Sequence, residues 1–146
     1  MRRIVQQHVR PFIRSQETDM DVYKTQGCFS WAELTTTDPA AAAQFYSQLF
    51  GWEVKAPMAE MGDYRIVNVG GEGVAGIMPP PPGAPTAPPS WGCYVTVTNT
   101  DKTAEQCQLL GGKVLVPAMD IPNVGRMAVL QDPQGAVLSV IAYPKA

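Results

Sequence analysis

Hydrophobic and polar positions along this chain change period repeatedly, which predicts short strands and two helices. Residues 29–36 are rich in aromatic and β-favouring side chains, as in a strand. Residues 39–50 carry apolar side chains at helical spacing. Asp38 and Pro39 suit the start of that helix, and Gly51 suits its end. Further strands are expected at 52–56, 64–69 and 73–78.

The second half of the sequence repeats this order of elements. The same patterns predict a strand at 91–97, a helix at 101–110 and strands at 113–117, 126–130 and 136–142. The glycines that follow the two helices, Gly51 and Gly112, are 61 residues apart, and Gly73 and Gly135 are 62 apart. This internal period predicts two β-α-β-β-β modules.

A proline-rich stretch separates the two modules. Residues 79–90 hold seven prolines, which favour an extended connector; a ligand for an aromatic-lined groove is the alternative. The predicted organisation is an N-terminal extension at 1–26, a first module at 27–78, a linker at 79–90 and a second module at 91–146. Residues 27–146 together are expected to form one α+β domain.

Composition and charge narrow the classes of function. The chain has 146 residues, enough for one domain, and its 16% of charged residues and net charge of −2 argue against a nucleic-acid partner. It has no apolar run of about 18 residues, so we expect no membrane span. Polar residues from Gln6 to Arg10 leave no apolar core for a secretory signal. The three cysteines, Cys28, Cys93 and Cys107, are expected to be buried, reduced thiols, which predicts a cytoplasmic protein.

Three stretches carry a family resemblance. They are Trp31-Ala-Glu-Leu-Thr-Thr-Thr-Asp-Pro, which continues to Leu49-Phe-Gly-Trp52; Leu110-Gly-Gly-Lys-Val-Leu-Val-Pro117; and Gly125 to Leu138, with its Asp-Pro-Gln-Gly. Over about residues 28–144 the chain resembles the glyoxalase/bleomycin-resistance/extradiol-dioxygenase superfamily, also called the vicinal oxygen chelate fold. The resemblance implies βαβββ modules related by a pseudo-twofold axis, with curved mixed sheets enclosing a cavity.

The resemblance also implies where a metal would be held. Familiar enzymes of this superfamily bind a divalent ion through His, Glu or Gln from the first and fourth strands of each module. Those positions fall on Trp31, Ile77, Gly92 and Ser139, none of which is a credible metal ligand. We therefore expect no metal and no cofactor, in contrast to glyoxalases and dioxygenases.

Strand alternation predicts which side chains line the cavity. Ala32, Leu34 and Thr36 are expected to face the first helix, and the expected lining is Trp31, Glu33, Thr35, Gly92, Tyr94, Thr96 and Ser139. Glu33 is the candidate functional carboxylate, because burial would raise its pKa towards that of a general base. The alternative is a carboxylate that is merely solvated or hydrogen-bonded by a neighbouring Tyr or Arg.

Several functions fit these features. The leading hypothesis is a metal-free protein that sequesters or senses a small apolar or aromatic compound. The alternatives are a lyase or isomerase with Glu33 as base and Tyr94 or Ser139 as donors, a metal-dependent enzyme with non-standard ligands, and a scaffold whose basic arm and proline-rich linker bind partners. The expected partner is a small molecule. Pairing of the modules within one chain or across a homodimer is left open.

Overall fold

The computed structural model describes residues 20–57, 59–83 and 87–145. The single histidine, His8, and most of the predicted extension lie outside these residues, as does the middle of the linker. The elements, in chain order, are β1 (Phe29–Thr35), α1 (Pro39–Phe50), β2 (Glu53–Val54), the 3-10 turn η1 (Ala59–Met61), β3 (Arg65–Val69), β4 (Glu72–Met78), β5 (Ser90–Thr96), α2 (Thr100–Leu109), β6 (Lys113–Ile121), β7 (Gly125–Gln131) and β8 (Val137–Ala142).

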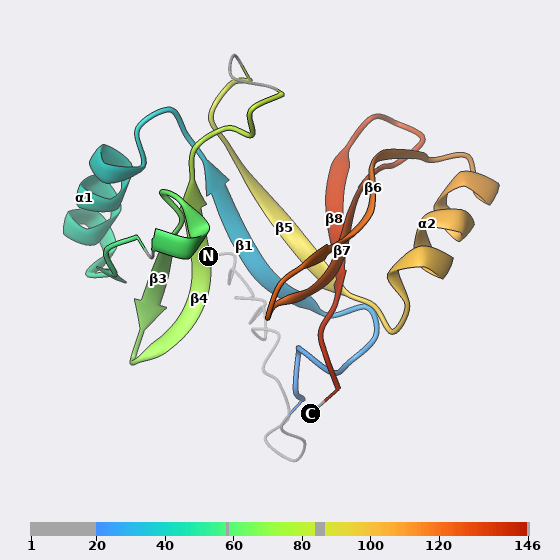
Figure 1. Cartoon of the computed structure of the whole chain (residues 1–146), viewed down its shortest axis with the longest axis horizontal. Coiled ribbons are helices and arrows are strands. Elements are labelled where there is room, and N and C mark those ends of the chain that lie inside the picture. Colours follow the sequence, from blue (N-terminus) through green and yellow to red (C-terminus); the bar gives the residue numbers. More distant parts are fainter. Residues whose placement is uncertain (1–19, 58, 84–86, 146) are drawn as a thin grey trace, which may run out of the picture.

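The strands form one curved mixed sheet that runs through both halves of the chain (Figure 1). Its order is β2-β3-β4-β1-β5-β8-β7-β6, so each half has the same strand order, read outward from the centre. Strands β1 and β4 are parallel, as are β5 and β8, while β1 and β5 are antiparallel. The α+β class and the two related modules are thus confirmed, and the modules are joined within one chain through β1 and β5.

The pairing of β1 with β5 marks the centre of the pseudo-twofold relation. Ala32 is paired with Cys93, which is 61 residues later, so this pair relates each module to the other. On either side of it, Trp31 is paired with Tyr94 and Glu33 with Gly92. Glu33 and Tyr94 therefore occupy equivalent positions in the two modules, as do Trp31 and Gly92.

Helix α1 begins where the sequence predicts, and α2 begins at Thr100, one residue before its predicted start. The Asp38 carboxylate accepts a hydrogen bond from the Ala41 amide (3.0 Å), and the Asn99 side chain accepts one from the Lys102 amide (2.9 Å). Gly51 ends α1 in the left-handed conformation, with φ 71°. None of the helices in the described part of the chain is long and apolar enough to cross a membrane.

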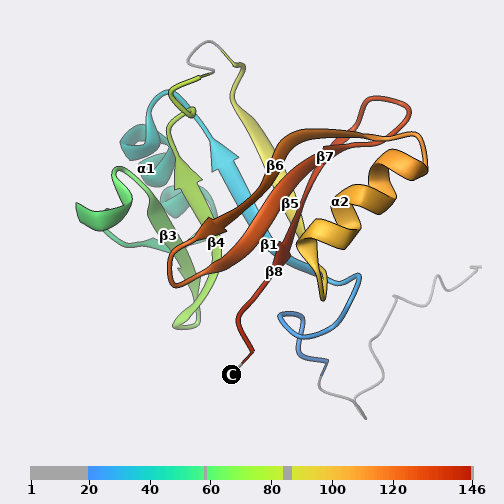
Figure 2. The ribbon, with the colours of Figure 1, turned by 45° about the vertical axis from the view of Figure 1, so that its right-hand side comes forward.

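The helices cover one face of the sheet, here called the outer face, at opposite ends (Figures 1 and 2). Beneath α1 lies a core formed by Leu34, Ala43, Val67, Ala75 and Ile77, and the second half has its own core of Val97, Ala128 and Val140. The opposite, inner face carries a third cluster, in which Trp31 packs against Tyr94, Met127 and Ile141.

The cysteines differ from the prediction of buried thiols. Cys93 is exposed, and Cys28 and Cys107 are half-buried. Cys93 alternates with the inner-face residue Tyr94, so it lies on the outer face, at the middle of the sheet. The two helices lie towards the two ends of the sheet (Figure 1), and Cys93 is left exposed between them.

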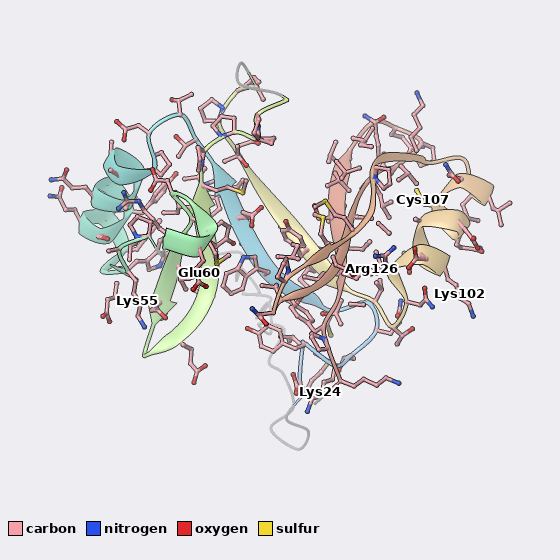
Figure 3. All side chains as sticks on the ribbon, viewed as in Figure 1. Lys24, Lys55, Glu60, Lys102, Cys107 and Arg126 are labelled. Carbon is pink, nitrogen blue, oxygen red and sulfur yellow. The ribbon has the colours of Figure 1, made fainter. Side chains whose placement is uncertain are left out.

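Arg126 joins α2 to the edge of the second module, where it lies beside that helix (Figure 3). Its guanidinium donates to both carboxylate oxygens of Asp101 (2.8 and 3.0 Å) and to Asp120 (3.1 Å). The two-pronged ion pair holds the pKa of the Asp101 carboxyl below its usual value. Arg126 is therefore engaged in surface salt bridges.

Candidate functional site

Glu33 is the centre of a hydrogen-bond network on the inner face. The Tyr64 hydroxyl donates to Glu33 Oε2 (2.8 Å), and the Tyr94 hydroxyl donates to Oε1 (3.0 Å). The indole Nε1 of Trp31 donates in turn to the Tyr64 oxygen (3.0 Å). We call Trp31, Tyr64, Glu33 and Tyr94 the Glu33 network. The two phenols donate directly to the carboxylate, and the indole supports one of them.

Strand geometry explains how these side chains meet. Trp31 and Glu33 are two residues apart on β1 and therefore share a face. Pairing with β5 places Tyr94 beside Trp31. Leu34, the next residue along β1, packs in the core beneath α1, as the alternation predicts. The sequence thus predicted the direction of Glu33 correctly, and the structure shows hydrogen bonds to two tyrosines.

Glu33 lies between two glycines on the neighbouring strands, Gly76 of β4 and Gly92 of β5. A Cβ at Gly76 would overlap the ring and hydroxyl of Tyr64, so the absence of a side chain there lets Tyr64 reach Glu33. A Cβ at Gly92 would meet only the Glu33 backbone oxygen, at 3.9 Å. Tyr64 therefore occupies the space over Gly76, whereas the space over Gly92, beside the carboxylate, is open.

Tyr64 is the member of the network that sequence reasoning missed. It lies just before β3, two strands away from β1, and no local pattern connects it to Glu33. The signal that could have found it is Gly76, a glycine in the middle of an otherwise apolar strand, which often marks a close approach by another group.

Burial dominates the electrostatics of the site. It raises the pKa of the Glu33 carboxyl above its ordinary value, and the hydrogen bonds from Tyr64 and Tyr94 partly oppose that rise. Burial, together with the nearby Glu33 charge, also raises the pKa of both phenols. Both tyrosines therefore remain protonated donors at neutral pH, and Glu33 holds its proton more tightly than an exposed glutamate.

Ser139 lies beside Tyr94 in the second module, and its position corrects one prediction. It pairs with Tyr94, and its side chain partly opposes the rise in the pKa of Tyr94. Because Glu33 corresponds to Tyr94 and pairs with Gly76, the counterpart of Ser139 is Gly76. The predicted counterpart, Ile77, is wrong by one residue: it is fully buried in the core beneath α1.

Two further predicted lining residues, Thr35 and Thr96, make no hydrogen bond to the Glu33 network in the described part of the chain. Thr35 is two residues beyond Glu33 and pairs with Met78 and Ser90. Thr96 is buried, and its hydroxyl donates to the Val22 carbonyl (2.6 Å). It also borders a hollow of about 410 Å³ that contains no member of the Glu33 network. The Thr96 hydroxyl therefore binds the segment before β1 through this hydrogen bond.

The residues at the family's metal positions do not fit a divalent ion. With the corrected register these positions are Trp31, Gly76, Gly92 and Ser139, which supply no imidazole or carboxylate. Within residues 20–57, 59–83 and 87–145, no three His, Cys, Asp or Glu side chains come together in a group suited to a metal. Glu33 is a single carboxylate engaged by two phenols.

The fold and this site define a protein of the vicinal oxygen chelate type. A family model described as glyoxalase/bleomycin resistance protein/dioxygenase superfamily matches residues 29–140, so the chain belongs to that superfamily. A solved structure with the same fold is the hypothetical protein BH1468 of Bacillus halodurans, with a TM-score of 0.64 at 9% identity, over 84% of this chain and 98% of that one.

Two curated relatives are closer in sequence. "Putative glyoxylase CFP32" of Mycobacterium tuberculosis is 41% identical over 118 residues, which are 79% of this chain and 45% of the relative. "Anthracycline biosynthesis protein DnrV" of Streptomyces peucetius is 33% identical over 129 residues, covering 78% and 46%. The chain thus spans less than half the length of these relatives.

Proposed function

We propose that the inner face binds a small apolar or aromatic compound without a metal ion, and that the chain thereby sequesters or senses this compound. The observation that carries the proposal is the Glu33 carboxylate, with both oxygens held by phenol donors beside the open space at Gly92. Aromatic surfaces with one oriented polar group are typical of sites for such compounds. The name of DnrV, which refers to a class of aromatic compounds, agrees with this choice.

Ligand binding to matched variants tests the proposal. A set of small aromatic compounds is screened by thermal shift, and the affinities of those that bind are measured by calorimetry. Glu33→Gln keeps the shape of the side chain but removes its charge, and should weaken binding about tenfold. Glu53→Gln, an exposed glutamate of the same module, is the control and should leave binding unchanged. Equal affinities in all three proteins would contradict the proposal.

Metal analysis separates this function from the conventional chemistry of the superfamily. Purified protein should hold no stoichiometric Zn, Ni, Mn or Fe, because the positions that would bind it carry no ligand. One tightly bound ion per chain, lost on replacing Glu33, would instead favour an enzyme with non-standard ligands.

A second candidate is a lyase or isomerase that uses Glu33 as general base. Burial brings the pKa of this carboxyl closer to neutral pH, which favours proton transfer, and Tyr94 lies at hydrogen-bonding distance as a donor. Ligands found in the screen should be incubated in D2O with the protein. Exchange of a carbon-bound proton, abolished by Glu33→Gln, would favour catalysis; binding without exchange would favour the binding module.

A further inference from the structure

The two modules carry side chains of very different size at Trp31 and Gly92, which occupy equivalent positions under the pseudo-twofold relation. In the first module this position carries an indole, which packs in the inner-face cluster and lies 3.7 Å from the Cβ position of Gly73. In the second module it carries no side chain, and a Cβ there would have only one neighbour within 4 Å. An aromatic surface on one side of the sheet centre therefore has no counterpart on the other.

Two side chains on the neighbouring strands share the inner face with Gly92. Glu33 is its pairing partner on β1, and on β8 Val137 lies two residues before Ser139, the partner of Tyr94, and therefore on the same face as Ser139. Val137 is an exposed apolar side chain, 56% accessible. Strands on either side of β5 are about 10 Å apart, so one planar ring can stand between the two side chains.

The Glu33 carboxylate, which is the polar group beside Gly92, accepts hydrogen bonds. Tyr64 and Tyr94 both donate to the Glu33 carboxylate, and its free lone pairs can accept from one more donor. A carbonyl or carboxylate on a ligand would meet this acceptor unfavourably. A neutral hydroxyl suits it better than a cation, because a cation would have to lose its own hydration at a site where burial already disfavours charge.

From these observations we propose that the site takes a planar aromatic ring bearing a hydroxyl, with the ring seated on the Gly92 backbone between Glu33 and Val137 and the hydroxyl donating to Glu33. The inference rests on the proposed function and names the class of ligand and the glycine that selects it. Gly92 is thus a specificity-determining residue, and a larger side chain there would occupy the place of the ring.

The test uses 2-naphthol as probe, with affinity measured by calorimetry and ring-current shifts by NMR. Wild-type protein should bind 2-naphthol, with an upfield shift of the Gly92 signals. Gly92→Leu should weaken binding at least about tenfold without lowering Tm, because the added side chain enters open space. Cys93→Leu, the next residue on the opposite face, is the control for added volume and should bind like wild type.

The inference and the proposed function fail in distinguishable ways. If Glu33→Gln weakens binding but Gly92→Leu does not, the inner face binds ligands and the assignment of Gly92 is wrong. If 2-methoxynaphthalene or 2-naphthylmethylammonium binds as tightly as 2-naphthol, or more tightly, the proposal that a ligand hydroxyl donates to Glu33 is wrong. If 2-naphthol does not bind, or binds without shifting the Gly92 signals, the proposed position of the ring is wrong, and this result does not depend on whether Gly92→Leu folds. If neither Glu33→Gln nor Gly92→Leu changes binding, the proposed function is wrong as well.

Discussion

The Tyr64 hydroxyl occupies the space that any side chain at Gly76 would need. Gly76→Ala should therefore displace Tyr64, break its hydrogen bond to Glu33, and lower the free energy of unfolding by about 1–3 kcal/mol. Urea unfolding measures this effect. Gly92→Ala, on the other side of Glu33, adds the same methyl group to open space and should be neutral or slightly stabilising. Equal stabilities of the two variants would contradict this account of Tyr64.

Glu33 should make the protein less stable as the pH rises through the acidic range. Its pKa is raised above 4.5 in the folded protein, so the folded state keeps a proton that the unfolded chain releases. The stabilisation is complete below pH 4.5, is lost between 4.5 and the raised pKa, and is absent above it. The free energy of unfolding of Glu33→Gln, relative to wild type, should therefore increase from about pH 4 to pH 8.

Urea unfolding at a series of pH values checks this dependence on pH. Tyr64→Phe serves as the comparison, because loss of its hydrogen bond removes an effect that lowers the pKa of Glu33 and should deepen the loss of stability. A difference between Glu33→Gln and wild type that stays constant with pH would show that Glu33 titrates as it does in the unfolded chain.

Thr96 should contribute to stability rather than to ligand binding. Its buried hydroxyl donates to the Val22 carbonyl, so Thr96→Val leaves that carbonyl without its donor and should cost about 1–3 kcal/mol. Thr98→Val, at an exposed threonine nearby, should cost little. Hydrogen exchange should show faster opening near Gly27, whose amide donates to the Thr96 carbonyl. If Thr96→Val is as stable as wild type but binds ligand more weakly, Thr96 belongs to the binding site and this prediction is wrong.

The two helix caps should contribute independently. Asp38→Ala and Asn99→Ala each remove a side-chain acceptor from the first turn of a helix, and each should cost about 1 kcal/mol. The caps lie in different modules, so the double variant should lose the sum. A clearly non-additive loss, seen by chemical denaturation, would mean that the two helices are coupled through the shared sheet.

Local chemistry made most of the fold predictable. Helix α1 has the predicted bounds, because Asp38, Pro39 and Gly51 are strong start and stop signals. Strand β6 was predicted to end at Pro117 but continues to Ile121. It is the edge strand, where a proline needs no partner on its outer side, and its pairing with β7 shifts register around this proline.

The site was predictable where it depends on alternation along a strand, as for Glu33 on β1 and Tyr94 on β5. Alternation along β1 gave the direction of Trp31 and Glu33, but Tyr64 reaches the site across β4 and has no signal within its own segment. Ile77 was misplaced because the spacing between the modules, 61 residues at the helix ends and 62 at Gly73, has grown to 63 at Gly76 and Ser139. A single inserted residue reverses the face of a strand residue.

The equivalence of Glu33 and Tyr94 constrains how this site could arise by duplication of one ancestral module. In a symmetric duplicate both positions would carry the same residue, because the two halves would be identical. Two glutamates would bring two carboxylates together in a partly buried place, where they repel and one must take up a proton. Two tyrosines would leave no acid at all. A carboxylate held by a phenol from the opposite half can therefore exist only after the two copies have diverged at this pair.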